Sequence, residues 1–253
     1  MEKITSRENA KVKYACRLAS SGAFRRAEGR FLAEGRKLCP ELCRGAELET
    51  LFCTESALEK CPELSELPGE HYLVEDHVAD KLADVGTHQG VFGVFRTPVH
   101  TLEEVKTGGR YLALERVQDP GNVGTVWRTA DAFGAAGLFL LPGCAEPFAP
   151  KTVRATMGAC FRLPVWEGTL EDLTGLLARS AVSLYAAALR DDTEDIRSVP
   201  LGSAAVVIGS EGRGVSQPVL DACRATLKIP MRDRCESLNA AVAASVVLWE
   251  GWR

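Results

Sequence analysis

The second half of the chain alternates short apolar runs with helical patterns, and this alternation constrains the fold more than any other feature. Apolar runs that predict strands lie at residues 110–117, 137–142, 182–189, 204–211 and 225–231. Helical patterns lie at residues 122–133, 170–180, 216–223 and 237–253. Near-continuous apolar strands alternating with helices predict an α/β fold, with a mostly parallel sheet covered by helices.

The first part of the chain predicts a smaller α/β unit. Residues 9–21, "NAKVKYACRLASS", space their apolar side chains as a helix does. Strand-like runs follow at residues 48–55, 71–76 and 90–98. Pro98 and the glycines of "KTGGR" separate the two parts. We therefore expect one domain at residues 1–97, a linker at 98–108 and a second domain at 109–253.

Composition is consistent with such a protein. The 253 residues suffice for one large or two modest domains, and 46% hydrophobic with 25% charged residues is ordinary for a soluble globular chain. No run approaches the roughly 18 apolar residues that cross a bilayer. The opening "MEKITSRENAKVK" lacks the apolar core of a signal peptide. We therefore expect a cytoplasmic protein without a membrane partner.

The nine cysteines are scattered singly along the chain. Cys39 and Cys43 form a C-x-x-x-C, but zinc sites usually need such pairs in duplicate or with histidines nearby. Reduced thiols are therefore the favoured interpretation, and we predict no metal site.

The net charge of −4 hides an asymmetry along the chain. Residues 1–37 carry ten Lys or Arg against four Glu, whereas residues 38–100 carry four basic and twelve acidic groups. A basic segment on an acidic protein is typical of local anion binding. A solvated helix surface explains the charge equally well.

Three loops rich in Gly, Pro, Ser and Asn follow three of the predicted strands. They read "ERVQDPGNVGTVWR", "GSEGRGVS" and "PMRDRCESLNAA". Ligands of open α/β sheets bind at the carboxyl ends of the strands. For each loop alone, simple turn chemistry is the stronger explanation. The first loop has no Lys-Ser or Lys-Thr pair of a P-loop and no G-x-G-x-x-G, which argues against a nucleotide-dependent oxidoreductase.

The first loop carries two candidate side chains. Gly121 and Gly124 allow the backbone to approach another group closely. Asn122 suits a helix N-cap or a nearby polar contact. Arg128 could be an ordinary surface arginine, or its five-donor fork could contact a phosphate or a ribose hydroxyl.

The other two loops add an acid and a pair of small polar residues. Glu211 follows a buried strand and needs a partner to offset its desolvation, with Arg128 or Arg213 as candidates. Ser237 and Asn239 begin a helix of very small residues. Ser237 could simply be the N-cap of that helix.

The three loops in this order resemble the signature motifs of SpoU/TrmH-type RNA 2′-O-ribose methyltransferases, within the SPOUT class. The stretches that carry the resemblance are "QDPGNVGTVWRTADAFGA", "VVIGSEGRGVS" and "IPMRDRCESLNAAVAAS". Together they cover about residues 110–253. The segment from "ITSRENAKVKYACRLAS" to "FLAEGRKL" is similar to the RNA substrate-binding domain often attached to such enzymes.

The resemblance implies a knot, a cofactor and a dimer, none of which the pattern of strands and helices can indicate. The second domain would contain a deep trefoil knot, a rare exception to the rule against knotted chains. The knot loops would bind S-adenosyl-L-methionine, and the enzyme would be a homodimer with an active site built from both subunits. The implied reaction is methyl transfer to a ribose 2′-hydroxyl.

The resemblance also assigns residues by motif position. The polar catalytic positions match Asn122, Arg128, Glu211, Ser237 and Asn239. The cofactor-lining positions match Gly209, Ile229, Met231, Ser237 and Leu238. An arginine is almost fully protonated at neutral pH, so we expect Arg128 to position the ribose-phosphate rather than to accept a proton. We expect Glu211 to orient Arg128 or Asn122.

The resemblance also gives the basic segment a ligand, which is RNA. Its Lys and Arg side chains would contact RNA phosphates, namely Lys3, Arg7, Lys11, Lys13, Arg17, Arg25, Arg26 and Arg30. No aromatic residues interleave with them, which favours structured RNA read by shape, and we expect no DNA partner. Ribosomal RNA is the favoured substrate, transfer RNA is the alternative, and a catalytically inactive RNA-binding homologue is the remaining rival.

Overall fold

The computed structural model describes residues 1–83, 86, 88–190, 192–232 and 237–252. Their contacts divide the chain into two units. One unit comprises Met1–Val99 together with Glu146–Phe161, and the other comprises His100–Ala145 together with Arg162–Arg253. A short segment from the middle of the chain therefore packs with the first unit. The domain boundaries predicted from the sequence, with domains at 1–97 and 109–253 and a linker at 98–108, stay a prediction.

The first unit is built on a mixed five-stranded sheet in the order β1-β4-β3-β5-β2. The β1, β4 and β3 strands run parallel, while β5 pairs antiparallel with both β3 and β2. The strands are β1 Glu2–Ile4, β2 Arg30–Glu34, β3 Leu48–Cys53, β4 Glu70–Val74 and β5 Val91–Arg96. The helices are α1 Ala10–Ser20, α2 Gly22–Glu28, α3 Leu38–Leu42, α4 Glu55–Lys60, α5 Asp76–Leu82 and α7 Pro150–Thr156, with a 3-10 turn at Pro62–Glu66.

An internal arginine stabilises this unit. Arg25 of α2 is only 5% exposed, and its guanidinium donates to the carbonyls of Leu18 and Ala19 at the end of α1. The other side of the fork donates to Glu146 at 2.9 and 2.6 Å. Arg25 therefore satisfies helix-end carbonyls and anchors the segment that begins at Glu146.

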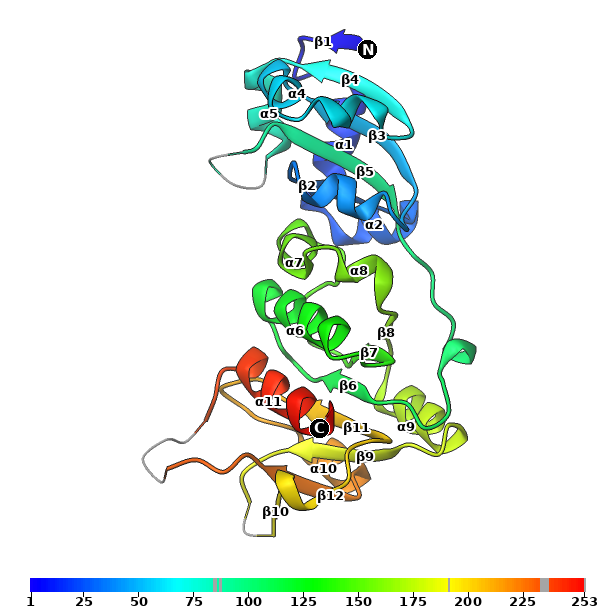
Figure 1. Cartoon of the computed structure of the whole chain (residues 1–253), viewed down its shortest axis with the longest axis vertical. Helices are drawn as coiled ribbons and strands as arrows, with labels where there is room; N and C mark the ends of the chain where they lie inside the picture. The colour runs from blue at the N-terminus through cyan, green and yellow to red at the C-terminus, as the bar shows by residue number, and fades with distance from the viewer. Residues whose placement is uncertain (84–85, 87, 191, 233–236, 253) are drawn as a thin grey trace. The chain divides into compact units, whose positions relative to one another are not determined.

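The second unit contains a seven-stranded parallel sheet in the order β10-β12-β9-β11-β6-β7-β8 (Figure 1). The strands are β6 Tyr111–Leu114, β7 Gly137–Leu140, β8 Val165–Glu167, β9 Ser183–Ala187, β10 Glu194–Asp195, β11 Ala204–Ile208 and β12 Ala225–Lys228. The helices are α6 Pro120–Ala132, α9 Leu170–Arg179, α10 Gln217–Ala222 and α11 Ala240–Trp252, with 3-10 turns at Leu102–Glu104 and Ile196–Ser198. In α8, Ala159–Arg162, the first three residues belong to the first unit and Arg162 to the second.

Helices cover both faces of this sheet. Tyr111 and Val207 share a core with α9 and α10. Leu112 and Val206, which point to the opposite face because side chains alternate along a strand, lie with Val247 of α11 and with the end of α6. Burial on both faces explains the unbroken apolar runs.

The predicted α/β class, the mostly parallel sheet and the smaller α/β unit are confirmed, and the structure adds that the sheet of the smaller unit is mixed. The prediction missed β8, β10, α7 and α8 in the second half of the chain and β1, α2, α4 and α5 in the first, because each has at most seven residues and none shows a clear periodicity. The trefoil knot stays a prediction. None of the helices in the described part of the chain is long and apolar enough to cross a membrane.

Candidate active site

Three loops at the carboxyl ends of β6, β11 and β12 bring polar side chains together in the second unit. The strands β6 and β11 are neighbours that pair Leu114 with Ile208 at their ends. The chain after β6 enters α6, the chain after β11 forms a glycine-rich turn, and α11 begins after the loop that follows β12. Parts of this last loop, residues 233–236, lie outside the described residues.

Glu211 is the centre of the polar cluster. Its Oε1 accepts hydrogen bonds from Asn122 Nδ2 at 3.0 Å, from Asn239 Nδ2 at 2.5 Å and from the backbone N of Ala240 at 3.3 Å. Asn239 Nδ2 also lies 3.2 Å from Asn122 Oδ1. The structure thus gives Glu211 two side-chain amide donors, Asn122 in the first turn of α6 and Asn239 at the start of α11. Among the described residues, neither Arg128 nor Arg213 forms a hydrogen bond or ion pair with Glu211.

The two helices that frame the cluster have different caps from those considered above. Asp119 caps α6, because its Oδ1 accepts from the backbone N of Gly121 and of Asn122 at 2.5 and 3.2 Å. Asn122 is therefore inside the helix and is not its cap. At α11 the cap is Asn239, whose Oδ1 accepts from Ala241 N and Val242 N. Ser237 precedes this cap, so the N-cap interpretation of Ser237 is wrong.

Asn239 consequently has two functions. Its side-chain Oδ1 accepts from backbone N–H groups in the first turn of α11, and its side-chain Nδ2 donates to Glu211. An aspartate would cap the helix equally well but could not donate. The asparagine at this position therefore serves the cluster as well as the helix.

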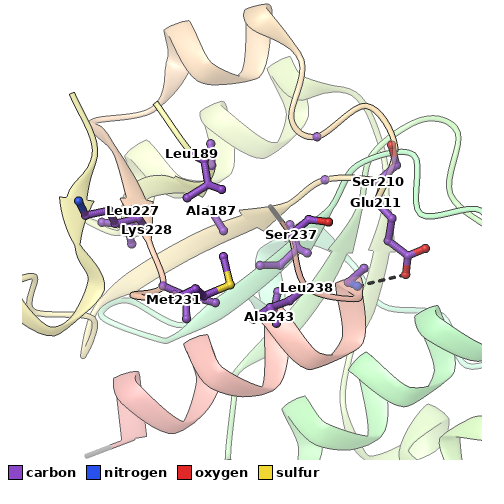
Figure 2. A pocket seen from close by; sticks show the side chains of 16 residues that line it. Ala187, Leu189, Ser210, Glu211, Leu227, Lys228, Met231, Ser237, Leu238 and Ala243 are labelled. Atoms are coloured by element: carbon purple, nitrogen blue, oxygen red, sulfur yellow. Dashed lines mark hydrogen bonds between the residues drawn. The ribbon is translucent and has the colours of Figure 1, made fainter. Parts of the chain in front are cut away.

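A cavity of about 250 Å³ lies beside the cluster, at the ends of β9, β11 and β12. All five predicted cofactor-lining residues line it, namely Gly209, Ile229, Met231, Ser237 and Leu238. Figure 2 shows Met231, Leu238 and Ala243 on one side and Glu211 at the edge, where it accepts the hydrogen bond from Ala240 N. Aliphatic walls with a few polar groups suit a small molecule that has both apolar and polar parts.

Gly209 has a packing reason to be glycine. A Cβ at this position would lie 2.2 Å from the backbone carbon of Gly214. Gly214 itself has a φ of +61° and folds back to receive this contact, with its N donating to Ser210 O. The turn can therefore bring its backbone against the cavity only if residue 209 has no side chain.

Arg128 lies apart from the cluster within one chain. It is exposed on α6, and it has no hydrogen bond or ion pair with the residues that the structure describes. It lies six positions after Asn122 in the sequence. At about 100° per residue the two side chains leave the helix in directions about 120° apart. One chain thus brings together Asn122, Glu211 and Asn239, and places Ser237 on the adjoining cavity, but it does not bring Arg128 to them.

The predicted RNA-contacting residues of the first unit differ in availability. Arg25 is buried, and Arg30 pairs with Glu49 at 2.5 Å, which holds the pKa of the Glu49 carboxyl below its usual value. The other six are at the surface, and each has an acidic, carbonyl or aromatic neighbour. The pairs are Lys3 with Glu75, Lys11 with Glu70, Lys13 with Glu8, Arg26 with Glu146, Arg7 with the carbonyl of His77, and Arg17 with the ring of Phe24. Exposed pairs of this kind are weak and exchange readily.

One polar residue at the site carried no recognised sequence signal. Arg116 is the second residue after β6 and has a φ of +56°, a conformation that arginine rarely adopts. The only sequence signal for a role of Arg116 in the site is that an arginine stands near the end of a predicted strand.

The second unit thus belongs to the α/β proteins that bind a small molecule at the carboxyl ends of a parallel sheet. Comparison with known proteins defines it further. Residues 109–249 match the model of the SpoU rRNA Methylase family, and residues 9–93 match the MRM3-like substrate binding domain. The chain belongs to the SpoU rRNA methylase family.

Similar proteins align over nearly the whole chain. It is 31% identical to the 23S rRNA (guanosine(2553)-2′-O)-methyltransferase RlmP of Bacillus subtilis, over 98% of both chains. It is 30% identical to the human mitochondrial rRNA methyltransferase 3, over 93% of this chain and 70% of the relative. The crystal structure of an AdoMet-bound rRNA methyltransferase from Sinorhizobium meliloti superposes with a TM-score of 0.85 at 31% identity, covering 99% of this chain and 97% of that one.

Proposed function

We propose that this protein transfers a methyl group from S-adenosyl-L-methionine to a ribose 2′-hydroxyl of ribosomal RNA. The observation that carries the proposal is the Asn122–Glu211–Asn239 cluster beside a cavity lined by all five predicted cofactor residues. Relatives described as rRNA methyltransferases, one of them solved with AdoMet, support both the cofactor and the substrate. Transfer RNA is the alternative substrate, and the cytoplasm is the proposed location.

The cavity fits the proposed cofactor by its chemistry. Gly209, Ile229 and Leu238 offer backbone groups between aliphatic side chains, which suits an adenine ring that needs both stacking and hydrogen bonds. Ser237 and Glu211 lie toward the polar cluster, where the reacting end of the cofactor would be held. When bound, the cofactor supplies an electrophilic methyl group on a sulfonium.

The reaction makes limited demands on the protein. The 2′-oxygen would form a bond to the methyl carbon as the carbon–sulfur bond breaks, the electron pair of that bond would go to sulfur, and the hydroxyl proton would pass to water or to a phosphate oxygen of the RNA. No anion develops that would need an oxyanion hole. The protein must instead hold the hydroxyl roughly 3 to 3.5 Å from the methyl carbon and in line with sulfur.

The polar cluster provides that positioning. Glu211 fixes both amide side chains, so Asn122 and Asn239 have defined orientations before substrate arrives. Pre-organised groups of this kind lose no freedom during the reaction. Glu211 is occupied as an acceptor from three donors, which suits an orienting group better than a general base.

Arg128 joins this site from a second subunit in our proposal. Within one chain it leaves α6 about 120° around the helix axis from Asn122, and we propose that a homodimer presents the Arg128 of one protomer to the cluster of its partner. The outer side of α11 has exposed apolar residues suited to such an interface. Val242 and Trp249 are each 49% exposed and Trp252 is 56% exposed, and the two tryptophan rings stack at 5.6 Å.

Substitution of Arg128 tests its role. We expect Arg128→Lys to lower kcat/KM about 10- to 100-fold, because Lys keeps the charge but loses the planar fork that holds a ribose-phosphate. Affinity for S-adenosyl-L-methionine, measured by calorimetry, should not change. Near-full activity of Arg128→Lys would refute the positioning role.

The first unit would bind the RNA. Six of its eight predicted contacts lie at the surface, and we propose these as phosphate contacts: Lys3, Arg7, Lys11, Lys13, Arg17 and Arg26. We leave Arg25 and Arg30 out of this surface, because their guanidinium groups are engaged inside the unit with Glu146 and Glu49.

A further inference from the structure

A second cavity, of about 300 Å³, opens beside the cofactor cavity. Its walls come from the loop after β6 and from the turn after β11, and it shares Ser210, Glu211 and Ala240 with the cofactor cavity. Asn122 of the polar cluster also lines it. The two cavities therefore meet at the cluster, so a group in one would lie next to a group in the other.

Two arginines, Arg116 and Arg213, line this polar cavity, and Arg116 is held there by unusual means. Its backbone has a φ of +56°, which is strained for a residue with a side chain. Gly143 leaves room for the arginine stem, because a Cβ at residue 143 would lie 2.8 Å from Arg116 Cγ. A glycine at residue 116 would adopt this backbone without strain. The chain instead has an arginine there, which suggests that the arginine side chain has a use.

The guanidinium of Arg116 is anchored but incompletely bonded. Its Nη2 lies 3.3 Å from Glu115 Oε1, and Glu115 is itself fixed by the backbone N and the hydroxyl of Ser216 at 2.8 and 2.5 Å. The Nε of Arg116 is buried and has no hydrogen-bond partner among the described residues. A guanidinium has five N–H donors. Apart from the buried Nε–H and the Nη2 contact with Glu115, the remaining N–H groups of Nη1 and Nη2 are left for a ligand.

The charges in the cavity define that ligand. Two carboxylates, Asp119 and Glu211, line the cavity with the two arginines, so the wall has no net formal charge. Asp119 already accepts from two backbone N–H groups, and Glu211 accepts from the amides and from Ala240 N. The two guanidinium groups are the cationic hydrogen-bond donors of this wall, and acceptor oxygens of a ligand would bind to them. These donors suit a group with one negative charge and acceptor oxygens next to a sugar. A phosphodiester of RNA is such a group.

We propose that Arg116, with Arg213, binds the phosphodiester next to the target ribose and so positions the 2′-hydroxyl toward the cofactor cavity. This inference rests on the proposed function and adds a substrate-binding residue to it. Arg116 is a positioning residue: it takes no proton and touches no reacting atom. Its contact is with backbone phosphate, so it contributes affinity and orientation without reading the base.

The test replaces Arg116 by glycine in the full-length protein. Glycine adopts the same backbone without strain, so Arg116→Gly should melt no lower than the unaltered protein. Binding to ribosomal RNA extracted from cells lacking the gene is measured by filter retention over a range of salt, with S-adenosyl-L-methionine present. We expect about tenfold weaker binding at low salt, and a slope of log K against log salt that is shallower by about 0.7 to 1.

Controls separate this inference from a structural role and from the proposed function. Arg179→Ala, at an exposed arginine on α9, should leave the salt slope unchanged. Arg116→Lys should restore the slope but not the full rate of methyl transfer. If Arg116→Gly binds RNA with unaltered affinity and slope, the inference is overturned while the methyltransferase proposal stands. If the unaltered protein neither binds the cofactor nor methylates RNA, the proposed function itself fails.

Discussion

At the residue scale, the site depends on a few residues that other residue types could not replace. Glu211 holds two asparagine amides, and Gly209 leaves space that no side chain could share. The sequence indicated these residues by motif and spacing. It could not indicate that Glu211 would choose Asn122 and Asn239 over two arginines, because that choice depends on where two helices begin in space.

Gly209 gives the sharpest residue-level prediction. Gly209→Ala would press a methyl group against the Gly214 backbone, so the turn must shift and the cofactor cavity must deform. We expect S-adenosyl-L-methionine affinity to fall at least about tenfold in calorimetric titration, equivalent to roughly 1.4 kcal/mol.

The same turn offers a matched control for that change. A Cβ at Gly212 would meet nothing within 4 Å, and its φ is not positive. Gly212→Ala should therefore bind the cofactor as the unaltered protein does. Equal loss of affinity in both variants would show that any substitution in the turn is harmful and would remove the packing argument.

Asn239 allows the cap and the cluster to be separated. Asn239→Ala removes both, and we expect a loss of about 1 kcal/mol in stability together with low activity. Asn239→Asp keeps the cap but replaces the donor with a carboxylate facing Glu211. That variant should retain more of the melting temperature than Asn239→Ala and yet transfer methyl groups at least about 100-fold more slowly. An active Asn239→Asp enzyme would contradict the role given to the amide.

At the element scale, the sequence predicted the long buried strands and the amphipathic helices well. Burial on both faces gives β9 and β11 unbroken apolar sequences that few other structures produce. The elements of residues 143–169 were missed, since β8 has only three residues and α7 has no strong periodicity. Helix ends were also uncertain: Ser237 and Asn239 are both good caps, and only the geometry distinguishes them.

The outer side of α11 carries the prediction about assembly. Trp249→Glu would put a charge into the apolar surface that we propose as the dimer interface. We expect light scattering after size-exclusion chromatography to report a monomer, and methyl transfer to fall strongly because Arg128 would no longer reach a partner's cluster. Arg179→Glu on α9, on the opposite face of the sheet, controls for the change in charge. A fully active monomer would contradict the shared site.

At the scale of the whole molecule, the chain combines two units of different chemistry. The first contains the basic segment predicted from the charge asymmetry, although burial shows that Arg25 serves the fold. The packing of Glu146–Phe161 with the first unit was beyond sequence patterning, because it depends on one ion pair and on contacts far apart in the chain. The full-length similarity to rRNA methyltransferases supports an RNA-binding unit joined to a methyltransferase unit.

The central claim is methyl transfer to a ribose 2′-hydroxyl of ribosomal RNA. The most direct measurement maps 2′-O-methyl groups in total RNA from cells with and without the gene, using the resistance of such positions to alkaline cleavage. We predict that one or a few ribosomal positions lose protection without the gene. Protection should return with the unaltered gene but not with the variant in which Asn122→Ala and Asn239→Ala are combined. An unchanged pattern in ribosomal RNA, or a change confined to transfer RNA, would contradict the account.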